Sequence, residues 1–391
     1  MAASTNYTDL AYDAETVFGT TDATPQFTIL PTTGGSPVNN VTTAVSDVIR
    51  SDRQTDDLVV VDGDISGDIN YELSYAPYQD FMDSVLMNDS VARTISLTAV
   101  TNDGTSDATI IGDTGIEAVC LVGDVVRLAS VTDSTIDGEY VIIASGTNEV
   151  TVYPTTGATT SLADLTVKAT DIQVNGADPI QGYTFRKKAN NAGSDYYWYY
   201  RGCAINTMNF NFATGSILNG SLGIVGLTEE TRTSTLTGEL TDVPTPPYSI
   251  MNSVSSVGVI RIDGVSLGTC TFSSLDLTID NQINAAKSIG TLGACDLAAF
   301  SLMVTGNTEV YFNNLDLYNK FLAATSFGIT IIVTDGDGNS LGINIPKCKF
   351  ETLDTPISGK DSFLMQSGTL KGLRDETGNY MIKITRIDSG A

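Results

Sequence analysis

The stretch that decides the fold is GDINYELSYAPYQDFMDSVL, residues 67–86, together with a similar stretch, GNTEVYFNNLDLYNKFLAAT, residues 306–325. Each begins with a glycine, continues with alternating apolar and polar residues, and then passes into Tyr-x-x-Phe. Period-two alternation is typical of a half-buried strand, and apolar residues three and four apart are typical of a helix. The sequence therefore predicts the same strand-then-helix unit twice.

The alternation assigns the side chains of each predicted strand to two faces. One face is expected to pack on a core and the other to be polar. The expected packed residues are Ile69, Tyr71, Leu73, Thr308, Val310 and Phe312. The expected polar-face residues are Asp68, Asn70 and Glu72 in the first strand, and Asn307, Glu309 and Tyr311 in the second.

The helices are predicted over Pro77 to Met87 and over Leu315 to Ala324. Proline suits a first helical turn because its missing N–H would be unpaired there anyway. Asn313, Asn314 and Asp316 are capping candidates for the second helix. Each helix is expected to cover the packed face of the strand before it.

Other elements recur in the same order on both sides of these units. A strand and a long loop precede each unit, and a hairpin with a Gly/Asn/Asp-rich turn follows it, at 183–212 and 329–353. A cysteine lies after the second arm of each hairpin, Cys203 and Cys348, and a closing strand comes next. Five elements in one order indicate an internal duplication.

Two segments fall outside the repeated pattern. Residues 90–181 interrupt the first copy and contain strand-like runs around Gly123 to Pro154, which predicts a small inserted β domain. TEETRTSTLTGELTDVPTPPY, beginning at Thr228, is rich in Thr, Glu and Pro and predicts an extended linker.

The composition narrows the class of protein. The 391 residues carry 46 acidic and 20 basic side chains, a formal charge of -26. This charge argues against a protein that binds nucleic acid tightly, because such binding needs Lys and Arg to neutralise phosphates. Histidine is absent, which removes the usual general base and zinc ligand. No apolar run approaches the ~20 residues of a membrane span, and the first residues do not read as a signal peptide. The five cysteines are interpreted as buried thiols, with neither a zinc site nor a disulfide framework.

Two motifs invite a ligand. TDGDGNS around Asp335 resembles a calcium loop, but Ser340 and Pro346 stand where the EF-hand pattern needs Gly and Glu, so a hairpin turn is the preferred interpretation. The aromatic run at 196–200, beside Arg186, Lys187, Lys188 and Arg201, could stack sugars or bases, or could pack in a core or at a subunit interface.

Longer segments carry a resemblance to a known family. ETVFGTTDATPQFTILP, SDVIRSDRQTDDLVVVDGDISGDINYELSYAPYQDFMDSVL, RGCAINTMNFNF and VIRIDGVSLGTCTFSSLDLTIDNQI are similar to segments of the major tail tube proteins of long-tailed bacteriophages. The similarity covers most of the chain outside the insertion. It implies a mainly β fold: a duplicated tail-tube β-sandwich or barrel with one flanking helix per copy, plus the inserted β domain.

The resemblance also implies an organisation of the chain. Residues 1–89 and 182–228 would form the first copy with an N-terminal arm, 90–181 the insertion on the outer wall, 229–249 the linker and 250–391 the second copy. Many such tubes have six-fold rings, so a duplicated chain would build an equivalent ring from three subunits, with a hexamer as the alternative. Stacked rings would enclose a lumen that holds a tape-measure protein and later passes double-stranded DNA.

Within that organisation, particular residues are candidates for particular surfaces. The lumen candidates are Asp68, Asn70, Glu72, Asn307 and Glu309. The loop from Ser51 to Asp64 and its counterpart from Ala285 to Phe300 are candidates for ring-to-ring contact. The ring-stacking candidates are Arg50, Asp52, Arg53, Gln54, Asp56 and Asp57.

The partners and setting follow from the same resemblance. The chain is expected to bind itself, the tape-measure protein and the proteins at the tail ends, in a virion assembled in the host bacterial cytoplasm. No cofactor, metal, catalytic activity or membrane insertion is expected. The alternative is a β-rich phage fibre or carbohydrate-binding protein that uses the aromatic run.

Overall fold

The computed structural model describes residues 4–52, 54–96, 100–101, 109–112, 116, 122–130, 137–153, 165–263, 265–266, 272–357, 359–376 and 378–389. Strands dominate these residues, as the sequence predicted. Apart from a short 3-10 turn at Thr5–Tyr7, the helices among them are α1 (Gln79–Leu86) and α2 (Asp316–Leu322). No helix in the described part of the chain is long and apolar enough to cross a membrane.

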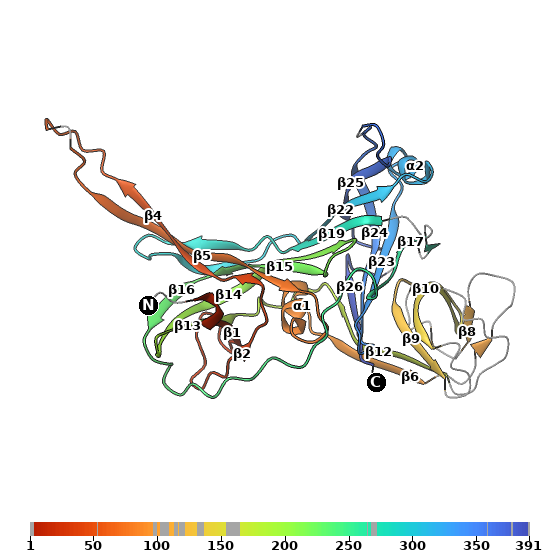
Figure 1. Cartoon of the computed structure of the whole chain (residues 1–391), viewed down its shortest axis with the longest axis horizontal. Helices are drawn as coiled ribbons and strands as arrows, with labels where there is room; N and C mark the ends of the chain where they lie inside the picture. The colour runs from red at the N-terminus through yellow and green to blue at the C-terminus, as the bar shows by residue number, and fades with distance from the viewer. Residues whose placement is uncertain are drawn as a thin grey trace.

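One antiparallel sheet runs through the middle of the molecule and is called here the central sheet (Figure 1). The short β3 (Gly34–Gly35) and then β4 (Val38–Val45) pair with the same edge of β5 (Leu58–Glu72), and the other strands follow in a single hydrogen-bonded order. The order is β4, β5, β15 (Asn219–Gly226), β14 (Ser194–Ala213), β19 (Phe272–Asp280), β22 (Met303–Tyr311), β25 (Met365–Gly372) and β24 (Ser340–Asp354).

The strands β14 and β24 each belong to two sheets. Their second halves lie in the central sheet, and their first halves lie in two further sheets, which we call the outer sheets. The first has the order β2 (Thr28–Ile29), β1 (Thr8–Ala14), β13 (Tyr183–Asn191), β14 and β16 (Thr228–Arg232). The second has the order β18 (Val265–Ser266), β17 (Val257–Ile262), β23 (Phe327–Thr334), β24 and β26 (Lys383–Ile387). We call β1–β5, α1 and β13–β16 the first unit, and β17–β26 and α2 the second unit.

The core of the first unit lies between the central sheet, the outer sheet and α1. Phe81 of α1 packs on Tyr12 and Phe185 with ring centroids 4.6 and 6.0 Å away. Ile69 and Tyr71 on β5 are fully buried, so the predicted packed face is the one that meets this core. The helix begins after Pro77, which lies in the preceding turn rather than in the first helical turn.

The two units have the same strand order. β13–β14–β15–β5 in the first corresponds to β23–β24–β25–β22 in the second. Gly67 pairs with Ile224 and Gly306 pairs with Leu370, so both glycines hold the same place in the ladder. Register shifts also recur: between Ile205 and Thr207 on β14, and between Phe350 and Thr352 on β24.

The strands between the two parts of the first unit lie against the second unit (Figure 1). They are β6 (Val91–Ser96), β7 (Val100–Thr101), β8 (Thr109–Gly112), β9 (Val125–Ser130), β10 (Gly138–Gly146), β11 (Glu149–Tyr153) and β12 (Leu165–Val174). β12 pairs with β26 of the second unit, from Asp171 opposite Arg386 to Val174 opposite Lys383. The inserted segment therefore leaves the first unit and docks on the second.

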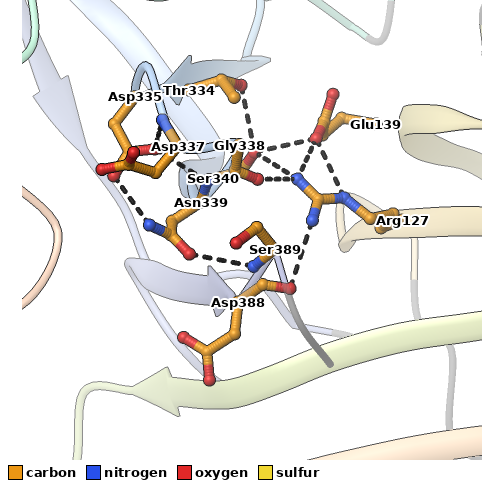
Figure 2. Close-up of polar contacts among 10 residues, drawn as sticks. All are labelled: Arg127, Glu139, Thr334, Asp335, Asp337, Gly338, Asn339, Ser340, Asp388 and Ser389. Atoms are coloured by element: carbon orange, nitrogen blue, oxygen red, sulfur yellow. Dashed lines mark hydrogen bonds and ion pairs between the residues drawn. The ribbon is translucent and has the colours of Figure 1, made fainter. Parts of the chain in front are cut away.

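Side-chain hydrogen bonds and ion pairs join the inserted segment to the second unit (Figure 2). Arg127 donates to Glu139 Oε1 at 3.1 Å and to the Asp388 carbonyl at 3.2 Å, and Ser340 Oγ donates to Glu139 at 2.8 Å. A buried ion pair joins Lys383 to Asp124. Because these partners come from three separate parts of the chain, the contact holds the inserted segment against both β24 and the C-terminal residues.

β4 and β5 continue beyond the body as a projecting two-stranded ribbon, which we call the arm (residues 38–61; Figure 1). Residues 58–64, predicted as part of a loop, belong to β5, so the connecting loop is confined to residues 46–57. The predicted loop at 285–300 is in fact largely a hairpin of β20 (Asn284–Lys287) and β21 (Ala294–Ala298). Strand pairing decides both cases: residues 58–64 pair with β4, and β20 pairs with β21.

Candidate functional site

The polar face of the central sheet carries all of the lumen candidates. Asp68 and Asn70 are exposed and Glu72 is half-buried, and they alternate along β5 with the buried Ile69 and Tyr71. On β22, Asn307 is exposed and Glu309 half-buried beside the buried Thr308 and Val310. All five lumen candidates therefore lie on the outward face of one sheet.

The strand register brings the candidates of the two units onto a shared surface. Asn70 lies opposite Ser221 of β15, which lies opposite Asn209 of β14. Asn209 lies opposite Thr278 of β19 and donates to its Oγ1 at 3.0 Å. The amide also donates to Asp276, which lies opposite Asn307. Side-chain hydrogen bonds thus cross the boundary between the units on this face.

Sequence reasoning missed the β14 and β19 part of this face. Asn209, Asn211, Asp276, Thr278 and Asp280 alternate with buried apolar residues in the same way as the β5 residues do. The signal was present in NTMNFNF and in SSLDLTID, where every second residue is apolar. The pairing of β14 with β19 was not foreseeable, because the two segments lie far apart in the chain.

The face is hydrophilic and carries net negative charge. Among the residues that the register places on it, the carboxylates include Asp68, Glu72, Asp276, Asp280, Glu309 and Asp354, and the cations include Lys349 and Lys371. Hydroxyl and amide side chains fill most of the other positions. No group of three His, Cys, Asp or Glu suited to a metal ion occurs in the described residues. This chemistry suits a wetted, anion-repelling wall.

The ring-stacking candidates lie at the tip of the arm. Arg50 donates from Nε to Asp52 at 3.2 Å and forms an ion pair with Asp56, so its charge is matched within its own loop. Its hydrogen bond lowers the pKa of Asp52 below the ordinary value. Gln54 and Asp57 are exposed beside this pair, and Arg53 lies outside the described residues. The arm carries exposed valines on both strands, including Val38, Val41 and Val45 on β4.

The β20–β21 hairpin contacts the base of the arm. Lys287 Nζ lies 2.5 Å from Asp62 Oδ2 and 2.7 Å from Asp64 Oδ1. Its hydrogen bond is the main cause that lowers the pKa of Asp62. The hairpin of the second unit is therefore joined to the arm of the first.

The aromatic run belongs mainly to the core. Tyr197, Tyr199 and Tyr200 are buried, and Tyr199 donates to Glu239 at 2.8 Å. Lys187 lies over the ring of the half-buried Trp198, 4.8 Å from its centroid, while Tyr196 is 41% exposed. A sugar-stacking platform needs exposed ring faces. Most rings of this run are buried or covered, so few are accessible to a sugar.

The segment after β16 is held against the first unit by a buried arginine. Arg186 forms ion pairs at 2.7 Å with Glu239 and with Asp242. Burial acts to lower the arginine pKa, but the two carboxylates outweigh it and the pKa is raised. The predicted linker is thus fixed to β13 over part of its length.

Asp335 serves a turn. Its carboxylate accepts from the backbone of Asp337 at 2.9 Å and of Asn339 at 2.8 Å, and from the Asn339 amide at 2.8 Å (Figure 2). The carboxylate is therefore directed at its own loop, between β23 and β24.

The cysteines differ in exposure. Cys203 and Cys348 are buried, and burial is the first cause that raises the pKa of the Cys203 thiol. Cys295 is exposed, so the interpretation of all five as buried thiols is wrong for it; Cys120 and Cys270 lie outside the described residues.

Both edges of the central sheet are open as far as the described residues show. Within the described residues, β3 and β4 pair only with β5, and β24 after Cys348 pairs only with β25. Exposed edges present unpaired N–H and C=O groups and usually find a partner.

One comparison with known proteins identifies a family. The family model described as phage tail tube protein matches residues 5–371, nearly the whole chain. No curated protein matches the chain.

Proposed function

Because the chain belongs to the phage tail tube protein family, and is thus a structural component of the virion tail, we propose that it self-assembles into stacked rings around a DNA conduit. The observation that carries this proposal is the central sheet. It runs through both units, presents one polar face, and ends in two open edges. Copies joined edge to edge would close such a sheet into a barrel and remove the edges.

An internal duplication is supported by the matched strand order, the matched glycines and the matched register shifts of the two units. Each chain then supplies two consecutive positions around the ring. Three chains would make a ring with pseudo-six-fold symmetry, which we favour over a ring of six chains. The inserted segment belongs on the outer wall in this arrangement, because it docks on an outer sheet rather than on the polar face.

The polar face is the proposed lumen wall. Asp68, Asn70, Glu72, Asn307 and Glu309 would line it, together with the β14 and β19 residues between them. Carboxylates repel the phosphates of a DNA duplex, and at physiological salt this repulsion acts within about 8 Å of the wall. DNA would then pass without sticking, after release of the tape-measure protein that fills the lumen in the assembled tail.

The part of the arm beyond residue 40, including its tip, is the proposed contact between rings. A two-stranded ribbon with exposed apolar side chains has little stability alone, and packing on another surface stabilises it. Arg50, Asp52, Gln54, Asp56 and Asp57 lie at its tip and would meet the adjacent ring or, at the tube ends, other tail proteins. Assembly would take place in the host cytoplasm and needs neither a cofactor nor catalysis by this chain.

Electron microscopy of the purified chain at high concentration tests the proposal. Hollow tubes with rings of three chains are expected in end-on averages made without imposed symmetry. Tubes built from six whole chains per ring would keep the function and refute the duplication argument. A chain that stays monomeric, also when tail-end proteins are supplied to initiate assembly, would refute the tube function.

A further inference from the structure

We propose that the chain joins a second copy of itself through a strand pair whose register is already present inside the chain. The end of β24 would pair with β4 of the neighbouring copy in the same way as the end of β14 pairs with β19. This inference rests on the proposed ring-forming function, and it names the strands and the residues that meet.

The internal seam supplies the template. The second half of β14 has β15 on one side and β19 on the other. The β19 side runs from Thr207 opposite Asp280 to Ala213 opposite Ser274, with Asn209 opposite Thr278. The seam between the two units is therefore an ordinary antiparallel ladder that any chain with the same two edges could form.

The end of β24 has the position of the β14 strand in this template. Cys203 lies opposite Tyr183, and Cys348 lies opposite Phe327, each just before the same register shift. Counting from these cysteines, Asp354 corresponds to Asn209. Both face outward on the polar side of the sheet, and the β24 residue lacks the neighbour that the β14 residue has.

β4 has the position of β19. Gly67 and Gly306 hold the same place in the ladder, so Ser66 corresponds to Thr305. Val38 lies opposite Ser66, and Thr278 lies opposite Thr305. Val38 therefore corresponds to Thr278, and the template places Asp354 opposite Val38 of the neighbouring copy.

Equivalent side chains are buried in the first unit and exposed in the second, as expected if a neighbouring copy covers the second unit in the ring. Phe212 on β14 is 4% exposed, whereas Ile357, its counterpart after β24, is 90% exposed. Met82 on α1 is 1% exposed, whereas its counterpart Leu322 on α2 is 64% exposed. The second unit covers part of the first, since Asn281 donates to the Val85 carbonyl of α1 at 2.8 Å. A neighbouring copy would cover the second unit in the same way.

Two prolines limit the length of the new ladder. Pro356 corresponds to Asn211 of the template, and Pro37 precedes β4. Proline has no N–H to donate and is confined to edge or terminal positions of strands. The seam between chains is thus expected to be centred on residues 352–354 and 38–40, shorter than the internal one.

Cysteine cross-linking tests the register. In a background with Cys120, Cys270 and Cys295 changed to serine, the test variant carries Asp354→Cys and Val38→Cys. A positive control carries Asn209→Cys and Thr278→Cys, the matching pair inside the chain. An off-register control carries Asp354→Cys and Asn40→Cys, because diagonal neighbours about 7–8 Å apart are too far from one another for a disulfide. All are oxidised under assembly conditions and run on non-reducing denaturing gels.

The test variant is expected to give a ladder that ends at the covalent trimer, while the positive control stays at the mass of one chain. Tubes visible by microscopy without cross-linking of the test variant, or with cross-linking of the off-register control instead, would overturn the register and leave the tube function standing. An internal disulfide with neither tubes nor cross-linked chains, even with an initiator present, would overturn the tube function itself.

Discussion

Replacing Ile357 by alanine is expected to weaken assembly without weakening the fold. The side chain is 90% exposed in the single chain, while its counterpart Phe212 is 4% exposed. Burial in the seam would remove nearly all of it from water. The change deletes three carbon groups, each contributing about 0.8 kcal/mol on burial, so about 2.4 kcal/mol per seam is lost. At about 1.4 kcal/mol per factor of ten, the concentration needed for tube growth should rise about 50-fold.

The assay is sedimentation of tubes over a dilution series, with chemical unfolding of the unassembled chain as the check on folding. Unfolding should change by no more than about 0.5 kcal/mol, because a surface substitution removes little buried area. Val254→Ala is the control, since Val254 is also highly exposed but lies in a turn that contacts Ser216 and Ile217, just before the interior strand β15. Growth of Ile357→Ala tubes at the wild-type concentration, or an equal defect in the control, would refute the reasoning.

Further predictions concern the interior, the lumen wall and pH. Arg186→Met should cost about 3–5 kcal/mol in urea unfolding because it leaves the buried Glu239 carboxylate without a counter-charge, whereas Arg232→Met, at a more exposed pair, should cost less than about 1 kcal/mol; equal effects would contradict the buried-pair argument. Gly220→Ala should destabilise the fold, since a Cβ there would lie 2.0 Å from the Asn209 carbonyl oxygen, while Gly336→Ala meets nothing within 4 Å and serves as its control. Tubes carrying Asp68→Lys and Glu309→Lys should retain duplex DNA at low salt and release it as salt rises, and tubes that stay free of DNA would argue against a lumen position. The lowered pKa of Asp62 means that its bond to Lys287 contributes stability above the ordinary aspartate value of 3.8, which is lost as the pH falls through the folded-state pKa. Hydrogen-exchange protection factors in β20–β21, which correct for the pH dependence of the intrinsic exchange rate, should fall in that pH range, and this fall should be absent in Lys287→Met.

Local pattern predicted the faces of the central sheet well. The alternation around Asp68 and Asn307 assigned most buried and polar positions correctly, because the side-chain period of a strand is fixed by its backbone. The prediction was wrong for Phe312, which follows the end of β22 and is half-buried. Both helices were found within a few residues for a similar reason. The β14 and β19 part of the same face carries the same alternation and was available to the same argument.

Long-range contacts were beyond that argument. Nothing local indicates that β14 pairs with β19, that Arg186 binds Glu239, or that the inserted segment docks on β26. Each joins residues that are distant in the chain, and tertiary packing selects among many chemically similar partners. The arm illustrates a second limit of local sequence patterns. DLVVVDG contains strand-forming residues, but only the pairing with β4 shows where β5 begins.

The seam between β14 and β19 has a kinetic consequence. Since both strands belong to one chain, this seam closes during folding, at an effective concentration set by the tether rather than by the supply of subunits. If rings contain three chains, half of their seams are made before any two molecules meet. Fusion also frees the two halves to diverge. The inserted segment is attached to one half only, so each ring would display it at alternate positions, a pattern that a ring of identical single units cannot produce.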